Sequence, residues 1–162
     1  MIQSILQKPK QERKPETMLF KNEDASLKLD VVSYELPADG GDLTSDDRNW
    51  LVLRATWINE DGLLIKDSNS CLLTYELQEM TAGLKVVKAG LKQRYESEFT
   101  EPYFMLSAEA EGEQYHFYVS FTLPNTMEDE DVAELYADMN EAEMKELIDE
   151  LDRLCRKFPD RN

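Results

Sequence analysis

Apolar and polar residues alternate in several stretches of the chain, which predicts a protein built largely from β-strands. The alternation is clearest at residues 114–123, where Tyr115, Phe117, Val119 and Phe121 would all face one side. A two-residue period is typical of a strand with one buried face. The other segments predicted as strands are residues 26–36, 50–58, 63–66, 92–99, 103–110 and 132–137.

A period of three to four residues predicts two amphipathic helices. The first would begin at Cys71, with Ser70 as its N-cap. The second would begin after Asn140, where Glu143 completes a variant of the capping box, and would stop before Pro159. These elements predict an α+β fold, in which a curved, mostly antiparallel sheet of about six or seven strands is packed by two helices, the second of them C-terminal.

Length and composition predict one domain that follows a tail. The chain has 162 residues, enough to bury a core, but residues 7–16 contain no aliphatic or aromatic side chain. Such a segment buries too little surface to offset the entropy lost when it becomes ordered. We therefore expect a flexible tail over residues 1–17 and a single domain over residues 18–160. Two explanations of the tail stay open: an extension specific to this protein, or translation that starts at Met18.

The charge balance is strongly acidic and bears on the choice of partner. The chain has 18 basic and 34 acidic residues, for a formal net charge of -16. This charge disfavours nucleic acids and anionic membranes as partners and favours basic proteins, although solubility alone is an equally good explanation. Because we find neither a signal peptide nor a membrane span, we expect a cytoplasmic protein.

Few residues suit catalysis or metal binding. His116 is the single histidine, and we interpret it as an ordinary strand residue because no nucleophile and orienting acid accompany it. Cys71 at a predicted helix start would have an activated thiol, but its apolar neighbours favour burial. For Cys71 and Cys155 together, buried reduced thiols are favoured over a disulfide. The sequence therefore predicts no catalytic residue, no cofactor and no metal site.

Two groups of carboxylates are candidates for binding a partner. Asp46 and Asp47 lie in a polar loop, and Glu128, Asp129, Glu130 and Asp131 form a run ahead of the last helix. The run lacks the glycine and the alternate spacing of a calcium loop. One interpretation is a solvated connection, and the other is an electrostatic docking surface for a basic protein.

Five short motifs occur in an order and at a spacing that resemble the WapI family of bacterial immunity proteins. The motifs are Tyr34-Glu35-Leu36-Pro37, Asn49-Trp50-Leu51, the segment 71–77, Phe99-Thr100-Glu101-Pro102 and the closing Phe158-Pro159. The resemblance covers about residues 18–160. It implies a protein that stays in the cytoplasm and neutralises a toxin delivered between bacteria, often a nuclease, by binding its C-terminal domain. No family motif marks a binding site, so the resemblance transfers none.

The leading hypothesis is therefore a non-catalytic immunity protein that binds and neutralises a cognate toxin domain of basic, nuclease type. The alternative is an acidic adaptor or scaffold for another basic protein. An enzyme would need an unexpected cluster of polar side chains around His116 or Cys71. The sequence does not give the oligomeric state or the identity of the toxin.

Reversing the charge of the two acidic groups tests the docking interpretation. Replacing Asp46, Asp47 and residues 128–131 by lysine should slow association with a basic partner at low salt, while the fold stays almost unchanged. Stopped-flow association rates at two salt concentrations measure the effect. An unchanged rate would discard this placement.

Overall fold

The computed structural model describes residues 17–38, 44–123 and 131–161. Residues 1–16 of the predicted tail, and Glu128, Asp129 and Glu130 of the acidic run, lie outside the described residues. Asp131 is described in its backbone only. Across the described residues, no helix has the length and apolar character needed to cross a membrane.

The first half of the domain forms a four-stranded antiparallel sheet in the order β1-β2-β3-β4. A short 3-10 turn, Asp47–Asn49, precedes its third strand. The register of β2 against β3 shifts between Val31 and Ser33. The strands are β1 (Thr17–Lys21), β2 (Ser26–Tyr34), β3 (Trp50–Ile58) and β4 (Leu64–Leu73).

The second half forms another four-stranded antiparallel sheet, in the order β5-β6-β7-β8. The strand predicted at residues 114–123 has the predicted bounds, and the short edge strand predicted at residues 132–137 is longer than expected. The strands are β5 (Arg94–Glu96), β6 (Phe104–Glu111), β7 (Gln114–Leu123) and β8 (Asp131–Met139).

The α+β class and the C-terminal helix are confirmed, but the prediction of one curved sheet with six or seven strands is wrong. The described residues contain eight strands in two sheets. Alternation shows that a strand has a buried face, but it does not say which strands pair. The helix α1 (Thr74–Lys88) connects β4 to β5, which are edge strands of two different sheets. The strands before and after α1 therefore belong to separate sheets, although the sequence prediction placed them in one.

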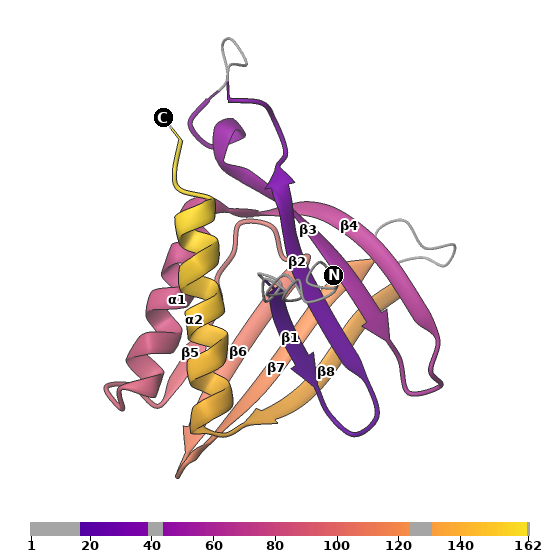
Figure 1. Cartoon of the computed structure of the whole chain (residues 1–162), viewed down its shortest axis with the longest axis vertical. Coiled ribbons are helices and arrows are strands. Elements are labelled where there is room, and N and C mark those ends of the chain that lie inside the picture. The colour runs from indigo at the N-terminus through magenta and orange to yellow at the C-terminus, as the bar shows by residue number, and fades with distance from the viewer. Residues whose placement is uncertain (1–16, 39–43, 124–130, 162) are drawn as a thin grey trace, which may run out of the picture.

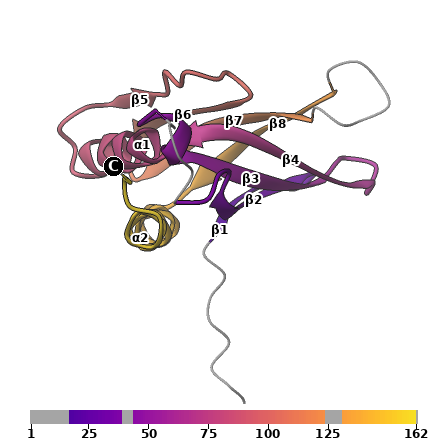
Figure 2. The same ribbon diagram turned by 90° about the horizontal axis from the view of Figure 1, so that it is seen from above.

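The two sheets stack face to face and the helices close one end. Figure 1 shows the strands of one sheet crossing those of the other, with α1 beside α2 (Glu141–Lys157) at one side. Figure 2 shows the sheets as two layers. Phe20 of β1 and Phe117 of β7 meet between the layers with ring centroids 5.8 Å apart, and both side chains are fully buried. One core therefore unites both halves of the chain.

The first helix begins at Thr74, so the predicted start at Cys71 is wrong. Leu72 and Leu73 pair with β3, so the apolar run that suggested a helix start is the end of a strand. The carboxylate of Glu76 accepts hydrogen bonds from the backbone N–H of Leu73 at 3.0 Å and of Thr100 at 2.7 Å. At the start of the helix, the buried Glu76 carboxylate therefore binds the backbone N–H of the N-cap residue Leu73, and Ser70 is not the N-cap.

The second helix begins and ends as predicted, and the chain then returns to β2. Asn140 and Glu143 form the reciprocal capping box, with bonds of 2.8 and 3.1 Å. Beyond α2, the backbone carbonyl of Pro159 accepts a hydrogen bond from the Tyr34 hydroxyl at 2.5 Å, and the Arg161 guanidinium lies 3.6 Å from the Tyr34 ring centroid. These contacts tie the C-terminal segment to the first sheet.

Gly83→Ala is expected to destabilise the protein, although alanine favours a helix over glycine by about 1 kcal/mol. A Cβ atom at residue 83 would lie 2.2 Å from Cδ1 of Tyr95, so the ring would have to move. We expect the free energy of unfolding to fall by roughly 1–3 kcal/mol in urea denaturation. In a Tyr95→Ala background the same change should be neutral or stabilising. A Gly83→Ala protein as stable as the wild type would contradict this packing.

Candidate functional site

Of the predicted acidic residues, Asp46, Asp47 and Asp131 lie within the described residues, and Asp131 lies apart from the other two. Asp46 is exposed, whereas Asp47 fixes a turn: its carboxylate accepts from the Thr44 N–H at 3.2 Å, and its own N–H donates to the Thr44 hydroxyl at 3.1 Å. Asp131 opens β8, opposite Leu123. Figures 1 and 2 show the turn before β3 and the start of β8 in different parts of the molecule.

The two thiols are not activated. Burial raises the pKa of Cys71 to about 12, and the charges of Glu76 and Glu101 act in the same direction. Burial also raises the pKa of Cys155, whose Sγ lies 3.5 Å from the Thr81 hydroxyl oxygen. Both cysteines are free. Within the described part of the chain, no three His, Cys, Asp or Glu side chains gather as they would around a metal ion.

The outer face of the second sheet carries two adjacent tyrosines. Register places Ser107, Tyr118 and Tyr136 opposite one another on β6, β7 and β8. The rings of Tyr118 and Tyr136 pack together with centroids 5.1 Å apart, and Tyr136 is 68% exposed. Figure 2 shows the first sheet and both helices away from this face, which is turned outward. An aromatic pair in which one ring is half-buried and the other largely exposed gives this sheet face a centre for contact with a partner.

Carboxylates surround the tyrosine pair. We define the tyrosine face as the outward side chains of the second sheet around Tyr118 and Tyr136. Arg94 is a cationic group among them, and His116 becomes one when it is protonated, set against five carboxylates. A hollow of about 370 Å³ lies at its centre. The acidic members of the face are Glu96, Glu109, Glu111, Glu134 and Asp138.

Ion pairs fix the orientation of part of this face. His116 Nδ1 lies 2.6 Å from Asp138 Oδ1, and its Nε2 lies 3.8 Å from Glu111 Oε2. Arg94 contacts Glu109 at 3.5 Å and Glu96 at 4.0 Å. Arg94 and His116 thus already contact carboxylates, and the face keeps an acidic surplus even when His116 is protonated. It can receive a cationic surface, with an aromatic centre for apolar contact.

Sequence analysis missed most of this face. The alternation in β7 placed His116 and Tyr118 on the side opposite the core, as the structure confirms. Glu134, Tyr136 and Asp138 repeat the same two-residue period in β8, but the segment was interpreted only as a short edge strand. That period was the signal that could have identified a second strip of the same face.

Comparison with known proteins identifies the family. The architecture defines an α+β protein with two stacked antiparallel sheets. Residues 18–159 match the Immunity protein WapI-like family, and because the match spans nearly the whole chain, the chain belongs to this family. The resemblance predicted from the sequence is thereby confirmed, and membership indicates a role in immunity to a toxin.

Solved structures give only distant similarity, and no curated protein matches the chain significantly. The structure of the plant transcriptional regulator PBF-2 is 16% identical over 88% of this chain and 82% of that chain, with a TM-score of 0.46. The structure of MRP1/MRP2 from Trypanosoma bruciei is 14% identical over 87% and 83%, with a TM-score of 0.45. Similarity at this level says nothing about function.

Asp138→Asn should lower the pKa of His116. The hydrogen bond to Asp138 favours the protonated ring and raises the pKa above its ordinary 6.5. A raised folded-state pKa means that this pair stabilises the protein below the unfolded-state pKa and loses its effect as the pH rises through the folded-state value. An NMR titration of the single histidine measures the shift. Equal pKa values in the wild type and the variant would contradict the pairing.

Proposed function

We propose that this protein neutralises a cognate toxin domain by binding it through the tyrosine face, without catalysis, in the cytoplasm. The observation that carries the proposal is the packed pair Tyr118–Tyr136, surrounded by carboxylates on a sheet face that no other helix or strand of the described residues covers. Family membership supplies the role, and the face supplies a surface suited to it.

The tyrosine pair suits the centre of a protein interface. A tyrosine ring buries a large apolar area and its hydroxyl still forms hydrogen bonds, so aromatic residues often contribute most of the binding energy at interface centres. Tyr136 has the greater exposed fraction of the pair, and therefore the most to bury. The sheet holds both rings on regular strands, so little side-chain entropy remains to be lost on binding.

The charge of the face favours a basic partner. Its carboxylates outnumber its cations, and the whole chain carries a net charge of -16. Long-range attraction of this kind accelerates capture of an oppositely charged protein. Domains that act on nucleic acids carry basic surfaces for their phosphate contacts, so a nuclease-type toxin has the complementary charge.

Inhibition needs no chemistry in this arrangement. An acidic surface that occupies the basic surface of a nuclease would exclude nucleic acid by charge and by volume. Immunity proteins of this kind are generally non-catalytic, and the thiols of this chain have raised pKa values. The toxin should therefore be recovered intact and active after it is dissociated from the complex. Covalent change of the toxin, detected by mass spectrometry, would contradict this mechanism.

Replacing Tyr136 tests the placement of the interface. Tyr136→Ala should weaken binding by about 2 kcal/mol, or roughly thirty-fold in Kd, as expected for a central aromatic anchor. The probe is the C-terminal domain of a large secreted protein encoded beside this gene, and isothermal titration calorimetry gives Kd.

Tyr75→Ala provides the matched control, because Tyr75 is an exposed tyrosine on α1, away from the face. Its Kd should equal that of the wild type. Equal loss of affinity in both variants, or no loss in Tyr136→Ala, would refute the placement. If the toxin domain does not bind at all, but another basic protein binds through Tyr136, the adaptor function replaces immunity.

A further inference from the structure

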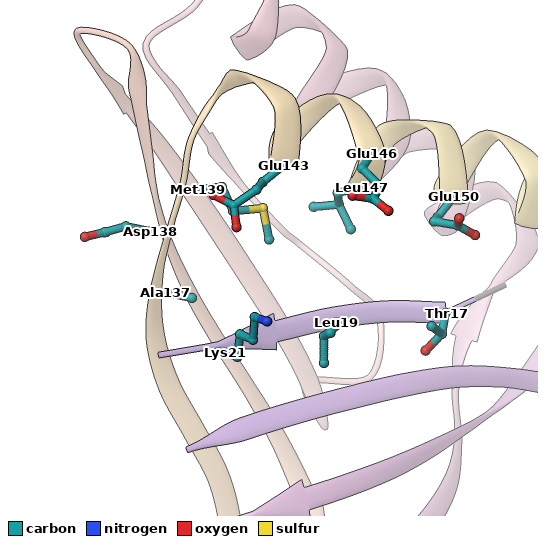
Figure 3. A pocket seen from close by; sticks show the side chains of 10 residues that line it. All are labelled: Thr17, Leu19, Lys21, Ala137, Asp138, Met139, Glu143, Glu146, Leu147 and Glu150. Atoms are coloured by element: carbon teal, nitrogen blue, oxygen red, sulfur yellow. The ribbon is translucent and has the colours of Figure 1, made fainter. Parts of the chain in front are cut away.

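A groove with an apolar floor and acidic walls lies between β1, the end of β8 and α2 (Figure 3). Its volume is about 300 Å³, enough for one long side chain. Leu19, Ala137, Met139 and Leu147 supply apolar surface, and Leu19 is 44% exposed. α2 packs beside β1, and β1 lies beside β8, so the groove is bounded by these three elements. The groove therefore suits a side chain that projects from a partner.

The walls of this groove are strongly asymmetric in charge. Glu143, Glu146 and Glu150 follow one side of α2 at spacings of three and four residues, which places them on one helix face. Figure 3 shows them along the side of α2 that faces β1. Lys21 is the one cationic side chain among the ten residues that line the groove.

One of these three carboxylates, that of Glu150, already binds a guanidinium. Arg153 forms an ion pair with Glu150, which is buried, and the Arg153 Nε lies 3.4 Å from Glu150 Oε2. Planar guanidinium groups match carboxylates with two parallel hydrogen bonds, and their aliphatic stems pack on apolar surface. An apolar floor beneath glutamates thus fits an arginine better than a compact, strongly hydrated ammonium.

The groove adjoins the tyrosine face across one strand. Ala137, Asp138 and Met139 of β8 line the groove, and the same strand carries Tyr136 and Asp138 on the tyrosine face. Figure 3 shows the Asp138 side chain pointing away from the other lining side chains. A partner that covers the tyrosine face can therefore pass the edge of β8 and place one side chain in the groove.

We propose that this groove receives an arginine side chain of the toxin domain. The arginine stem lies on Leu19, Met139 and Leu147, and its guanidinium meets Glu143 and Glu146. The source of the arginine rests on the proposed function, but the recognition itself does not require a toxin. Recognition at this second point explains how one acidic protein distinguishes its own toxin from other basic proteins.

The groove is tested first with N-acetyl-arginine methylamide, in low salt, by methyl NMR. The methyl signals of Leu19, Met139 and Leu147 should shift saturably. The uncharged isostere N-acetyl-citrulline methylamide should leave them unchanged. Glu143→Gln/Glu146→Gln should weaken the binding about three- to tenfold, since both carboxylates are exposed. Glutamine at residue 143 retains the capping box, so the helix start is preserved.

Glu60→Gln/Glu113→Gln is the matched control, because it removes the same charge from exposed sites outside the groove. Three results would overturn the proposal. They are an equal loss of affinity in the two double variants, equal methyl shifts with the citrulline compound, or tighter binding of N-acetyl-lysine methylamide than of the arginine compound. The complex of the toxin domain with the Glu143→Gln/Glu146→Gln protein should dissociate faster than the wild-type complex, whereas the complex with the control variant should not. If the toxin binds and its dissociation rate is unchanged, the arginine assignment fails while the proposed function stands.

Discussion

Each sheet of this protein can bury only one face, and the stacking of the two sheets determines everything else. Phe20 and Phe117 meet in the layer between them, and neither ring has solvent access. The helices then cover one end of the stack, where α1 connects the sheets (Figure 1). The outer faces of both sheets are left over, and that of the second sheet carries the tyrosine face. The surface available to a partner is thus a consequence of the same packing that makes the core.

Two polar anchors hold the connections that this arrangement requires. Glu76 receives the N–H groups of Leu73 and Thr100, and so joins the start of α1 to the segment that leads into β6. Arg161 and Tyr34 join the end of the chain to the first sheet. Buried carboxylates are stable when backbone donors satisfy them, which explains why an acidic residue can serve the fold as well as the surface. Carboxylates such as that of Glu76 therefore stabilise the fold and do not contribute to a binding surface.

Local patterns in the sequence predicted the elements well and their assembly poorly. The strict alternation in β7 predicted both ends of that strand, and the capping box predicted the start of α2. Both signals depend only on residues that are close together in the sequence. The run Cys71–Leu73 is apolar throughout and fits a strand or a helix, so the start of α1 was misplaced. The pairing of Tyr118 with Tyr136, like the division into two sheets, depends on contacts between segments far apart in the chain. Asp46 and Asp47 were visible as charges, but only geometry shows that Asp47 serves a turn.

The most direct test of the account is hydrogen–deuterium exchange of the complex with the toxin domain of the neighbouring secreted protein. The account predicts new protection concentrated on peptides from β6, β7 and β8, with a smaller gain at the first turns of α2. The strands of the first sheet would keep the exchange rates of the free protein. Protection confined to the first sheet, or to the turn around Asp46 and Asp47, would contradict the central claim that the toxin is held on the tyrosine face.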